Sequence, residues 1–144
     1  MLRLTHAIYM EMVAHCLAGL PDEACGLLVG SYGGEEATYL FPTPNAAASA
    51  MVYEIDPKDM LRVDRAAREL GADIMGVFHS HTHTDAYPSP TDVAQAGDPG
   101  WHYVLVSLRD TLPVVRSYLI REGVIVEEPV EVPGLEVPGA DGAA

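Results

Sequence analysis

Three histidines stand at every second position in the stretch GVFHSHTHTDAYPSPTD, residues 76–92. Residues i and i+2 of a β-strand point to the same face of the sheet, with Cα atoms roughly 6.6 Å apart. At that spacing two imidazoles can converge on one metal ion, each at a bond length of about 2.0–2.1 Å. If the segment is a strand, His79 and His81 are a candidate pair of metal ligands.

A third ligand has to come from another element. Asp92 lies in the first turn of a helix expected after the loop, close enough to return to the end of the strand. Two histidines and one carboxylate leave one position of a tetrahedral ion open, which distinguishes a catalytic zinc from a structural one. Cys16 and Cys25 are not spaced as a pair and lie far from the cluster in sequence, so a closed cysteine-rich site is not expected.

The same residues have a simpler interpretation. Ser89 as N-cap, Pro90 in the first turn and Asp92 at the third position resemble a capping box, which starts a helix without any chemistry. A lone pair of histidines on a strand is also more often structural than catalytic. The combination of both patterns at fixed spacing, with the acidic Glu23 upstream, favours a catalytic metal site.

The spacing of these motifs resembles that of a known family. The HSH of residues 79–81, followed after seven residues by Ser89 and after two more by Asp92, matches the pattern H-[ST]-H-x7-S-x2-D of the JAMM (MPN-plus) metalloproteases. Glu23 in PDEACGLLVG matches the upstream glutamate of that family. The resemblance extends over residues 1–132, which we expect to form a JAMM metallopeptidase domain.

The resemblance implies a role for each matching residue. His79, His81 and Asp92 would bind one zinc ion per chain, and Glu23 would act as general acid and base on the metal-bound water. Ser89 would donate a hydrogen bond to the tetrahedral oxyanion. Whether Ser89 caps the helix, stabilises the oxyanion or does both stays open.

The resemblance also bears on the substrate. Family members that cleave ubiquitin chains usually carry a long insertion after the motif, whereas only a short connection, residues 93–101, follows it here. The compact form resembles the bacterial Mec-type branch, which acts on small ubiquitin-like sulfur carriers ending in Gly-Gly and releases cysteine or a similar product. Two alternatives stay open: a JAMM isopeptidase or peptidase acting on another conjugate or a peptidoglycan peptide, and a non-catalytic scaffold of the same fold.

Such a carrier would present a flexible Gly-Gly tail to the metal. We expect strand edges beside GVFHSH, residues 76–81, to hold that tail by β-augmentation. Thr82 replaces the proline that often follows the second histidine, and His83 comes next as a possible competing ligand. An exposed loop histidine or a substrate contact is the simpler interpretation of His83, and a buried apolar thiol is the simpler interpretation of Cys25.

The composition of the chain limits the classes of molecule that it can bind. The chain has 144 residues, of which 49% are hydrophobic and 20% charged, as in a one-domain globular protein. A net charge of −13 disfavours nucleic acid and anionic membranes as partners. The N-terminus shows no secretion signal, no apolar run approaches the roughly 18 residues of a membrane span, and a reducing cytoplasm is the expected location. The oligomeric state is not predicted.

Hydrophobic periodicity and turn residues predict the order of elements. We expect helices over residues 8–20, 56–70 and 89–96, and strands over residues 24–32, 36–45, 51–55, 73–80, 101–108, 114–120 and 124–132. The order is mixed rather than alternating, which predicts an α+β fold, with a mixed, mostly antiparallel sheet flanked by helices. The resemblance implies the cytidine-deaminase-like α/β/α sandwich of the JAMM family. Residues 133–144 have turn formers and little to bury, so we expect a disordered tail.

Overall fold

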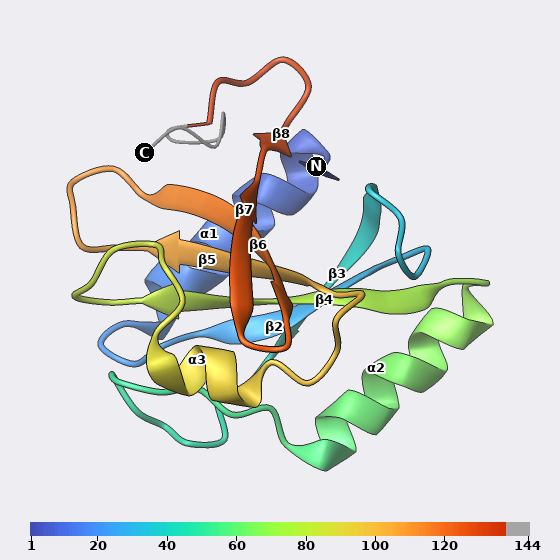
Figure 1. Cartoon of the computed structure of the whole chain (residues 1–144), viewed down its shortest axis with the longest axis horizontal. Coiled ribbons are helices and arrows are strands. Elements are labelled where there is room, and N and C mark those ends of the chain that lie inside the picture. The colour runs from blue at the N-terminus through green and yellow to red at the C-terminus, as the bar shows by residue number, and fades with distance from the viewer. Residues whose placement is uncertain (138–144) are drawn as a thin grey trace.

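The computed structural model describes residues 1–137, and all structural statements concern this part of the chain. Its elements in order are β1 (Leu2–Arg3), α1 (His6–Gly19), β2 (Cys25–Gly30), β3 (Ala37–Thr43), α2 (Pro57–Glu69), β4 (Asp73–His81), α3 (Pro90–Gln95), β5 (His102–Ser107), β6 (Val114–Arg121), β7 (Val124–Glu128) and β8 (Val130–Glu131). Six strands form one sheet in the order β3-β2-β4-β5-β6-β7, and β1 pairs with β8 (Figure 1). No helix here is long and apolar enough to cross a membrane.

The sheet is mixed, as predicted. The pair β4 and β5 runs parallel, and the other four neighbouring pairs of the main sheet are antiparallel. Because β4 is hydrogen bonded to β2 on one side and to β5 on the other, it has no free edge. A substrate tail that pairs with a strand edge beside residues 76–81 would therefore use another strand than β4, and this pairing stays a prediction.

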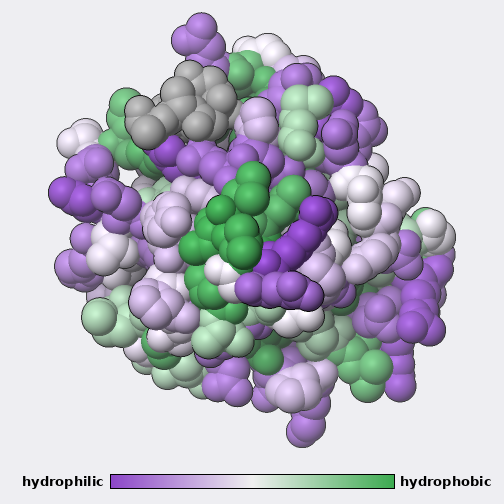
Figure 2. Space-filling model, in the orientation of Figure 1, coloured by the Kyte–Doolittle hydropathy of each residue, from purple (hydrophilic) through white to green (hydrophobic). Residues whose placement is uncertain are grey.

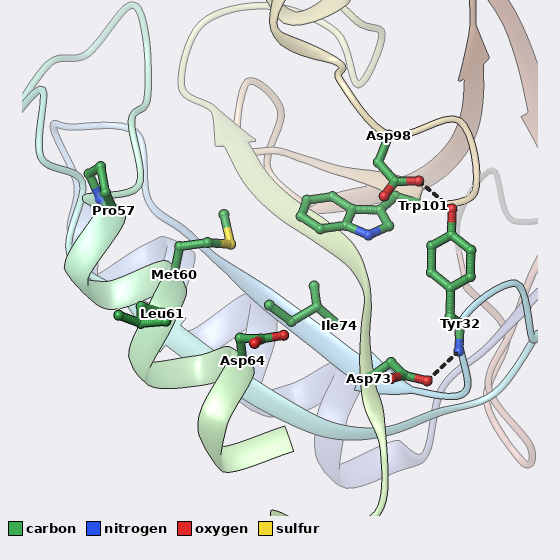
Figure 3. Close-up of a pocket in the computed structure, with 9 residues that line it drawn as sticks. All are labelled: Tyr32, Pro57, Met60, Leu61, Asp64, Asp73, Ile74, Asp98 and Trp101. Atoms are coloured by element: carbon green, nitrogen blue, oxygen red, sulfur yellow. Dashed lines mark hydrogen bonds between the residues drawn. The ribbon is translucent and has the colours of Figure 1, made fainter. Parts of the chain in front are cut away.

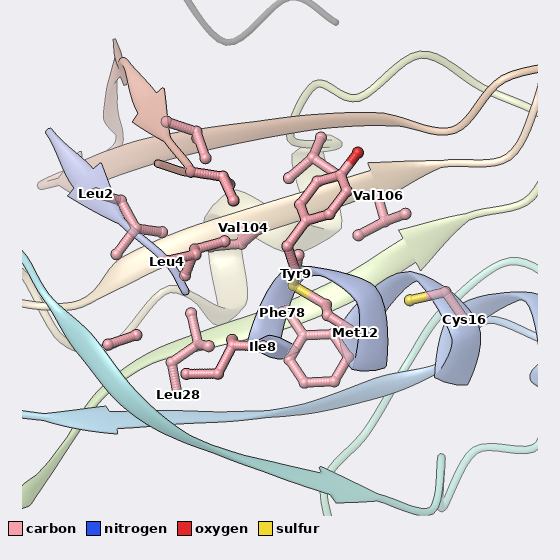
Figure 4. Packing of buried hydrophobic residues seen from close by; sticks show 14 of the residues in the cluster. Leu2, Leu4, Ile8, Tyr9, Met12, Cys16, Leu28, Phe78, Val104 and Val106 are labelled. Carbon is pink, nitrogen blue, oxygen red and sulfur yellow. The ribbon is translucent and has the colours of Figure 1, made fainter. Parts of the chain in front are cut away.

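Helices cover both faces of the sheet, which confirms the α+β prediction and the α/β/α layering. On one face Ile8, Met12 and Cys16 of α1, spaced four residues apart, pack on Leu28 and Phe78 (Figure 4). The cluster on the opposite face joins α2 and α3 to the sheet through these residues: Val63, Ala67, Val93, Leu27, Val77, Leu105 and Tyr118. All of β4 except its first residue is buried, so its last residues hold a fixed position.

Local sequence explains where the helices that border the site begin. The side chain of Asp56 accepts a hydrogen bond from the Lys58 backbone N–H, and Pro57 takes the first helical position of α2. Ser89 caps α3, and the capping box predicted from the sequence is present. Both helix starts follow from side chains within three residues of the cap.

The strand predicted over residues 51–55 is absent, and this segment is part of an irregular loop between β3 and α2. The Asn45 side chain instead forms hydrogen bonds with the backbone groups of this loop. Its Nδ2 donates to the carbonyls of Glu23 and Val52 at 2.9 and 3.0 Å, and its Oδ1 accepts from the backbone N–H groups of Ala47 and Glu54 at 3.0 Å each. These bonds replace the ladder that a strand would need.

One predicted strand near the C-terminus is divided into two in the structure. The strand expected over residues 124–132 is interrupted at Pro129, which separates β7 from β8 because proline cannot donate a ladder hydrogen bond. β7 is an edge strand whose Val124 and Val126 are exposed. Figure 2 shows a hydrophobic strip bordered by hydrophilic residues over the position that β7 takes in Figure 1.

The chain stays in contact with the core for a few residues after β8. Val132 and Leu135 form an isolated antiparallel bridge, and Leu135 and Val137 pack against the core beneath α1. The remainder of the tail that was predicted to be disordered, residues 138–144, lies outside the described residues. The domain boundary at residue 132 stays a prediction.

Candidate metal centre

The end of β4 brings two histidines and one aspartate together. His79 and His81 share one face of β4, and Asp92 comes from the first turn of α3. The two Nε2 atoms are 3.2 Å apart, and Oδ2 of Asp92 lies 3.2 Å from Nε2 of His79 and 3.0 Å from Nε2 of His81. Three potential ligand atoms therefore form a small, nearly equilateral triangle.

The triangle fits a zinc ion. A tetrahedral ion with bonds of about 2.05 Å has ligand atoms roughly 3.3 Å apart, close to the three observed separations. Two imidazole nitrogens and one carboxylate oxygen are also a ligand set that zinc accepts. Over residues 1–137 no other group of three histidine, cysteine, aspartate or glutamate side chains brings its ligand atoms together in this way.

Hydrogen bonds orient these side chains. Nδ1 of His81 lies 2.8 Å from the carbonyl oxygen of Asp85, and because a carbonyl only accepts, the ring proton is on Nδ1 and Nε2 is the ligand atom of the neutral ring. Oδ2 of Asp92 also accepts from the backbone N–H of Ser89 at 2.9 Å. The capping box thus holds the carboxylate that turns toward the histidines, so the structural and the chemical interpretations of this motif are compatible.

The electrostatics of the triangle favour an ionised carboxylate at Asp92 and a neutral imidazole at His79. Burial by itself raises the pKa of Asp92, but hydrogen bonds with His79 and His81 hold that pKa well below its ordinary value. Burial lowers the pKa of His79. Burial also lowers that of His81, but Asp92 and the Asp85 carbonyl raise it overall. Metal binding at His81 therefore competes with a proton.

Glu23 lies next to this cluster, two residues before the start of β2. Its side chain is 5% exposed, and burial raises the pKa of its carboxyl to about 7, with His81 lowering that pKa and Asp92 raising it. A carboxyl with such a pKa can both take and return a proton near neutral pH. Asn45 and Ser49 hold its backbone through bonds of 2.9 and 2.8 Å.

Ser80, between the two histidines, points to the other face and ties Glu23 to β4. Its Oγ accepts from the backbone N–H of Ala24 at 2.8 Å, and its own N–H donates to the Ala24 carbonyl at 2.9 Å. Ser80 is fully buried. Ala24, which follows Glu23, is thus fixed to Ser80 between the two histidines, which sets the Glu23 carboxyl beside the candidate metal centre.

The Ser89 hydroxyl accepts one hydrogen bond and remains available to donate another. Its Oγ accepts from the backbone N–H of Asp92 at 3.1 Å, which is the capping bond. No bond within residues 1–137 uses the hydroxyl hydrogen, and the side chain is half-buried. An oxygen that accepts from the helix can still donate to a neighbouring substrate.

Sequence reasoning missed Tyr53. Its ring stacks on that of His79, with centroids 4.2 Å apart and planes at 21°. The segment was predicted as a strand, which hid the possibility that a loop folds over the ligands. The turn-forming Pro44 and Asn45 were the available signal, because such residues favour a loop before the next element.

Three other residues of interest lie outside the ligand triangle. His83 is exposed, lies outside the ligand triangle, and its Nδ1 is 2.7 Å from Oγ1 of Thr82. Cys25 is a buried free thiol whose Sγ contacts Oγ1 of Thr43 at 3.5 Å. His102 is buried and paired with Glu128, away from the ligand triangle.

Comparison with known proteins finds close relatives. A family model described as prokaryotic homologs of the JAB domain matches residues 5–121. The chain is 45% identical over 122 residues to the CysO-cysteine peptidase of Mycobacterium tuberculosis (strain H37Rv), covering 84% of each chain. It is 32% identical over 116 residues to the probable TtuB-protein conjugate cleaving protease of Thermus thermophilus, covering 78% of this chain and 72% of that one. A solution structure of a protein from Desulfitobacterium hafniense superposes with a TM-score of 0.83 at 36% identity, covering 92% of both chains.

Proposed function

The chain belongs to the family of prokaryotic homologs of the JAB domain, and from this premise we propose that it is a zinc metallopeptidase acting on a small ubiquitin-like sulfur carrier. It hydrolyses the amide bond after the carrier's C-terminal Gly-Gly and releases cysteine or a similar product. The observation that carries the chemistry is the convergence of His79, His81 and Asp92 within 3.2 Å beside the buried Glu23. Likeness to a CysO-cysteine peptidase supports the substrate.

We assign His79, His81 and Asp92 as the residues that hold the zinc ion. Bound zinc polarises a carbonyl oxygen and lowers the pKa of a water ligand to about 7. The chain itself supplies a rigid set of ligand atoms, oriented by the Asp85 carbonyl and the Ser89 backbone N–H. Preorganisation of this kind removes the need to order the ligands during the reaction.

Glu23 moves the proton in this proposal. As a carboxylate it accepts a proton from the attacking water at its side-chain oxygen, and as a carboxylic acid it delivers that proton to the amine of the leaving product. Its pKa of about 7, raised by burial, suits both steps near neutral pH. Ser80 and Asn45 position this carboxyl through the neighbouring backbone.

Ser89 stabilises developing negative charge on the carbonyl oxygen of the scissile bond. Its hydroxyl hydrogen is not used by the capping bond, which engages only the oxygen as acceptor. A preorganised donor of this type is worth on the order of 3–4 kcal/mol at the transition state. Ser89 thus caps α3 and binds the oxyanion at the same time.

The carrier's Gly-Gly tail fits the buried position of the ligands. His79 and His81 are 4% and 5% exposed, so only a narrow chain can bring its carbonyl to them. Glycine has no side chain to obstruct that approach. A cytoplasmic location belongs to the same proposal, since both cysteines are free thiols, as is usual in a reducing compartment.

Mass spectrometry of a carrier–Gly-Gly–cysteine amide tests the proposal. The purified zinc enzyme is expected to release free cysteine and leave the carrier chain intact. The mass of the conjugate then falls by one cysteinyl residue. A conjugate with valine in place of the final glycine is the matched control and is expected to react at least about 100-fold more slowly, because the β-branched side chain crowds the metal centre. Equal rates for the two conjugates, or cleavage only of unrelated peptides, would remove the sulfur carrier as substrate and leave a JAMM peptidase of another specificity.

A further inference from the structure

A cavity of about 590 Å³ lies between α2, the first residues of β4 and two loops (Figure 3). The following apolar and aromatic residues line it: Tyr32, Pro57, Met60, Leu61, Ile74 and Trp101. Three carboxylates, those of Asp64, Asp73 and Asp98, complete the lining, which contains no lysine, arginine or histidine. The cavity therefore combines aromatic faces with negative charge.

One wall of this cavity is rigid. Oδ1 of Asp98 accepts from the Tyr32 hydroxyl at 2.7 Å and from the Gly100 backbone N–H at 2.8 Å. The backbone of Asp98 is fixed as well, because its N–H donates to the Tyr103 hydroxyl and its carbonyl accepts from it. A Cβ at Gly100 would collide with the Tyr32 ring, so glycine permits this close contact.

The carboxylates of the cavity keep acceptor capacity for a ligand. In Figure 3 one oxygen of Asp98 meets Tyr32 while the other turns toward Trp101. Asp64 pairs with Arg68, one helical turn away, but the Arg68 side chain is 76% exposed. Such an exposed ion pair contributes little to stability, so a cation of a ligand can replace Arg68 beside Asp64. An indole face beside carboxylate oxygens is the environment that a cationic side chain prefers.

The cavity continues toward the metal centre. A second cavity, of about 340 Å³, shares Met60, Asp98 and Trp101 with the first and extends to Tyr53. The ring of Tyr53 stacks on His79. The two cavities thus adjoin one another, and Tyr53, which lines the second, contacts one histidine of the ligand triangle. β4 itself offers no edge for pairing.

We propose that the larger cavity, formed around Tyr32, Asp64, Asp98 and Trp101, binds a lysine or arginine side chain of the carrier that precedes its Gly-Gly tail. The tail then runs through the second cavity past Tyr53 to the metal centre. This inference rests on the proposed function and adds a specificity site to it. A tail with only neutral side chains at this position loses both the ion pair and the contact with the indole.

Peptides of defined sequence test the cavity. The zinc enzyme is given synthetic peptides that end in Gly-Gly-Cys and carry one lysine at successive positions before the first glycine, each with a matched glutamine peptide. At one position, or two adjacent ones, lysine is expected to raise kcat/KM about 10-fold through KM alone, a magnitude typical of a partly desolvated cation beside an aromatic ring.

Variants identify the site of this preference. In the double variant Asp64→Asn/Asp98→Asn the lysine preference is expected to disappear, so that lysine and glutamine peptides have equal kcat/KM. Asparagine at position 98 can still accept from Tyr32 and Gly100, which keeps this wall of the cavity in place. Glu69→Gln, an exposed position of α2 outside the cavity, is the matched control and is expected to keep the preference. A preference that survives the double variant would place the cation elsewhere and overturn the proposal.

The outcomes separate this inference from the proposed function. If the wild-type enzyme cleaves the peptides but lysine has no effect at any position, the cation site is wrong and the peptidase assignment stands. If no peptide is cleaved, the proposed function fails, and the fluorescence of Trp101, the one tryptophan of the chain, decides the cation site. A saturable change with lysine peptides that glutamine peptides do not produce supports the site, and equal responses overturn it.

Discussion

Two buried clusters of histidine and carboxylate occupy opposite ends of neighbouring strands and differ in how their polar atoms are used. At the end of β4, the Nε2 atoms of His79 and His81 and Oδ2 of Asp92 turn toward one another. At the start of β5, His102 makes a 2.6 Å contact with Glu128, equally buried. Both clusters combine buried histidine with a carboxylate, which is 11% exposed at Asp92 and 5% exposed at Glu128.

In the second cluster, the ring nitrogens of His102 and the carboxylate of Glu128 are bonded to other protein groups. Nδ1 of His102 donates to Oε2 of Glu128, and Nε2 donates to the Gly34 carbonyl at 2.7 Å. Ser117 donates to the same carboxylate at 2.8 Å, and the amino group of Met1 pairs with its other oxygen at 3.0 Å. Since both ring nitrogens donate, the ring is the imidazolium ion and has no lone pair for a metal.

The difference shows that convergence of lone pairs, rather than proximity of histidine to carboxylate, identifies a candidate metal centre. In the first cluster one ring proton is held by the Asp85 carbonyl, and the Nε2 atoms face a common point. In the second cluster every ring nitrogen already has an acceptor. The comparison predicts that the first cluster determines activity and that the second determines stability.

The largest expected effect concerns the metal. His81→Ala removes one of three ligands and is expected to lose tightly bound zinc and more than about 1,000-fold of activity, because the remaining pair cannot complete the site. His102→Gln serves as the control and is expected to retain about one zinc per chain. Metal analysis of the purified proteins measures both. Equal, tight zinc binding by His81→Ala and wild type would show that the ligand assignment is wrong.

A slightly smaller effect is expected at Glu23. Glu23→Gln is expected to keep the fold, the zinc and substrate binding, and to lower kcat by about 100- to 10,000-fold, since the amide cannot accept a proton. Steady-state kinetics together with metal analysis measure this. Turnover within a few fold of wild type, with zinc present, would exclude Glu23 as the general base.

Ser89 separates capping from catalysis. Ser89→Gly removes the hydroxyl donor and is expected to lower kcat about 100-fold, while the melting temperature changes little because glycine is a tolerated N-cap. Ser89→Thr retains both functions and should stay close to wild type. A large loss of melting temperature in the glycine variant with kcat preserved would assign Ser89 to the cap alone.

The smallest effect is expected in the second cluster and depends on pH. Burial by itself lowers the pKa of His102, but the bonds to Glu128 and Gly34 raise that pKa above its ordinary value. The ion pair therefore stabilises the fold fully below about pH 6.5, and the stabilisation is lost as the pH rises through the raised pKa. His102→Gln is expected to lower the free energy of unfolding by about 2 kcal/mol at pH 6 and by less at pH 9.

Denaturant titrations of both proteins at the two pH values measure this difference. Burial by itself raises the pKa of Glu128, but its hydrogen bonds lower it, so the carboxylate stays charged over this range. A cost that grows from pH 6 to pH 9 would show that His102 is neutral in the fold. The two clusters would then differ less than their hydrogen bonds indicate.

Local sequence was sufficient for much of the architecture. The starts of α2 and α3 depend on the caps Asp56 and Ser89, and the bonds that make them span two or three residues. The strand that carries residues 79–81 also follows from a local apolar run. Spacing made His79, His81 and Asp92 candidate ligands, and the family resemblance implied that all three bind the metal. Their ligand atoms do converge, and their roles stay predictions.

Contacts between distant residues were decided by the tertiary structure. The stacking of Tyr53 on His79, the pairing of His102 with Glu128 and the bond from Tyr32 to Asp98 each join residues more than twenty positions apart. No periodicity or cap encodes such a pair, because its partners meet only after the strands have been ordered in the sheet. The sequence by itself therefore determined most of the helices and strands and which residues could bind a metal. Packing decided which histidine keeps its lone pair and that residues 51–55 form a loop beside His79.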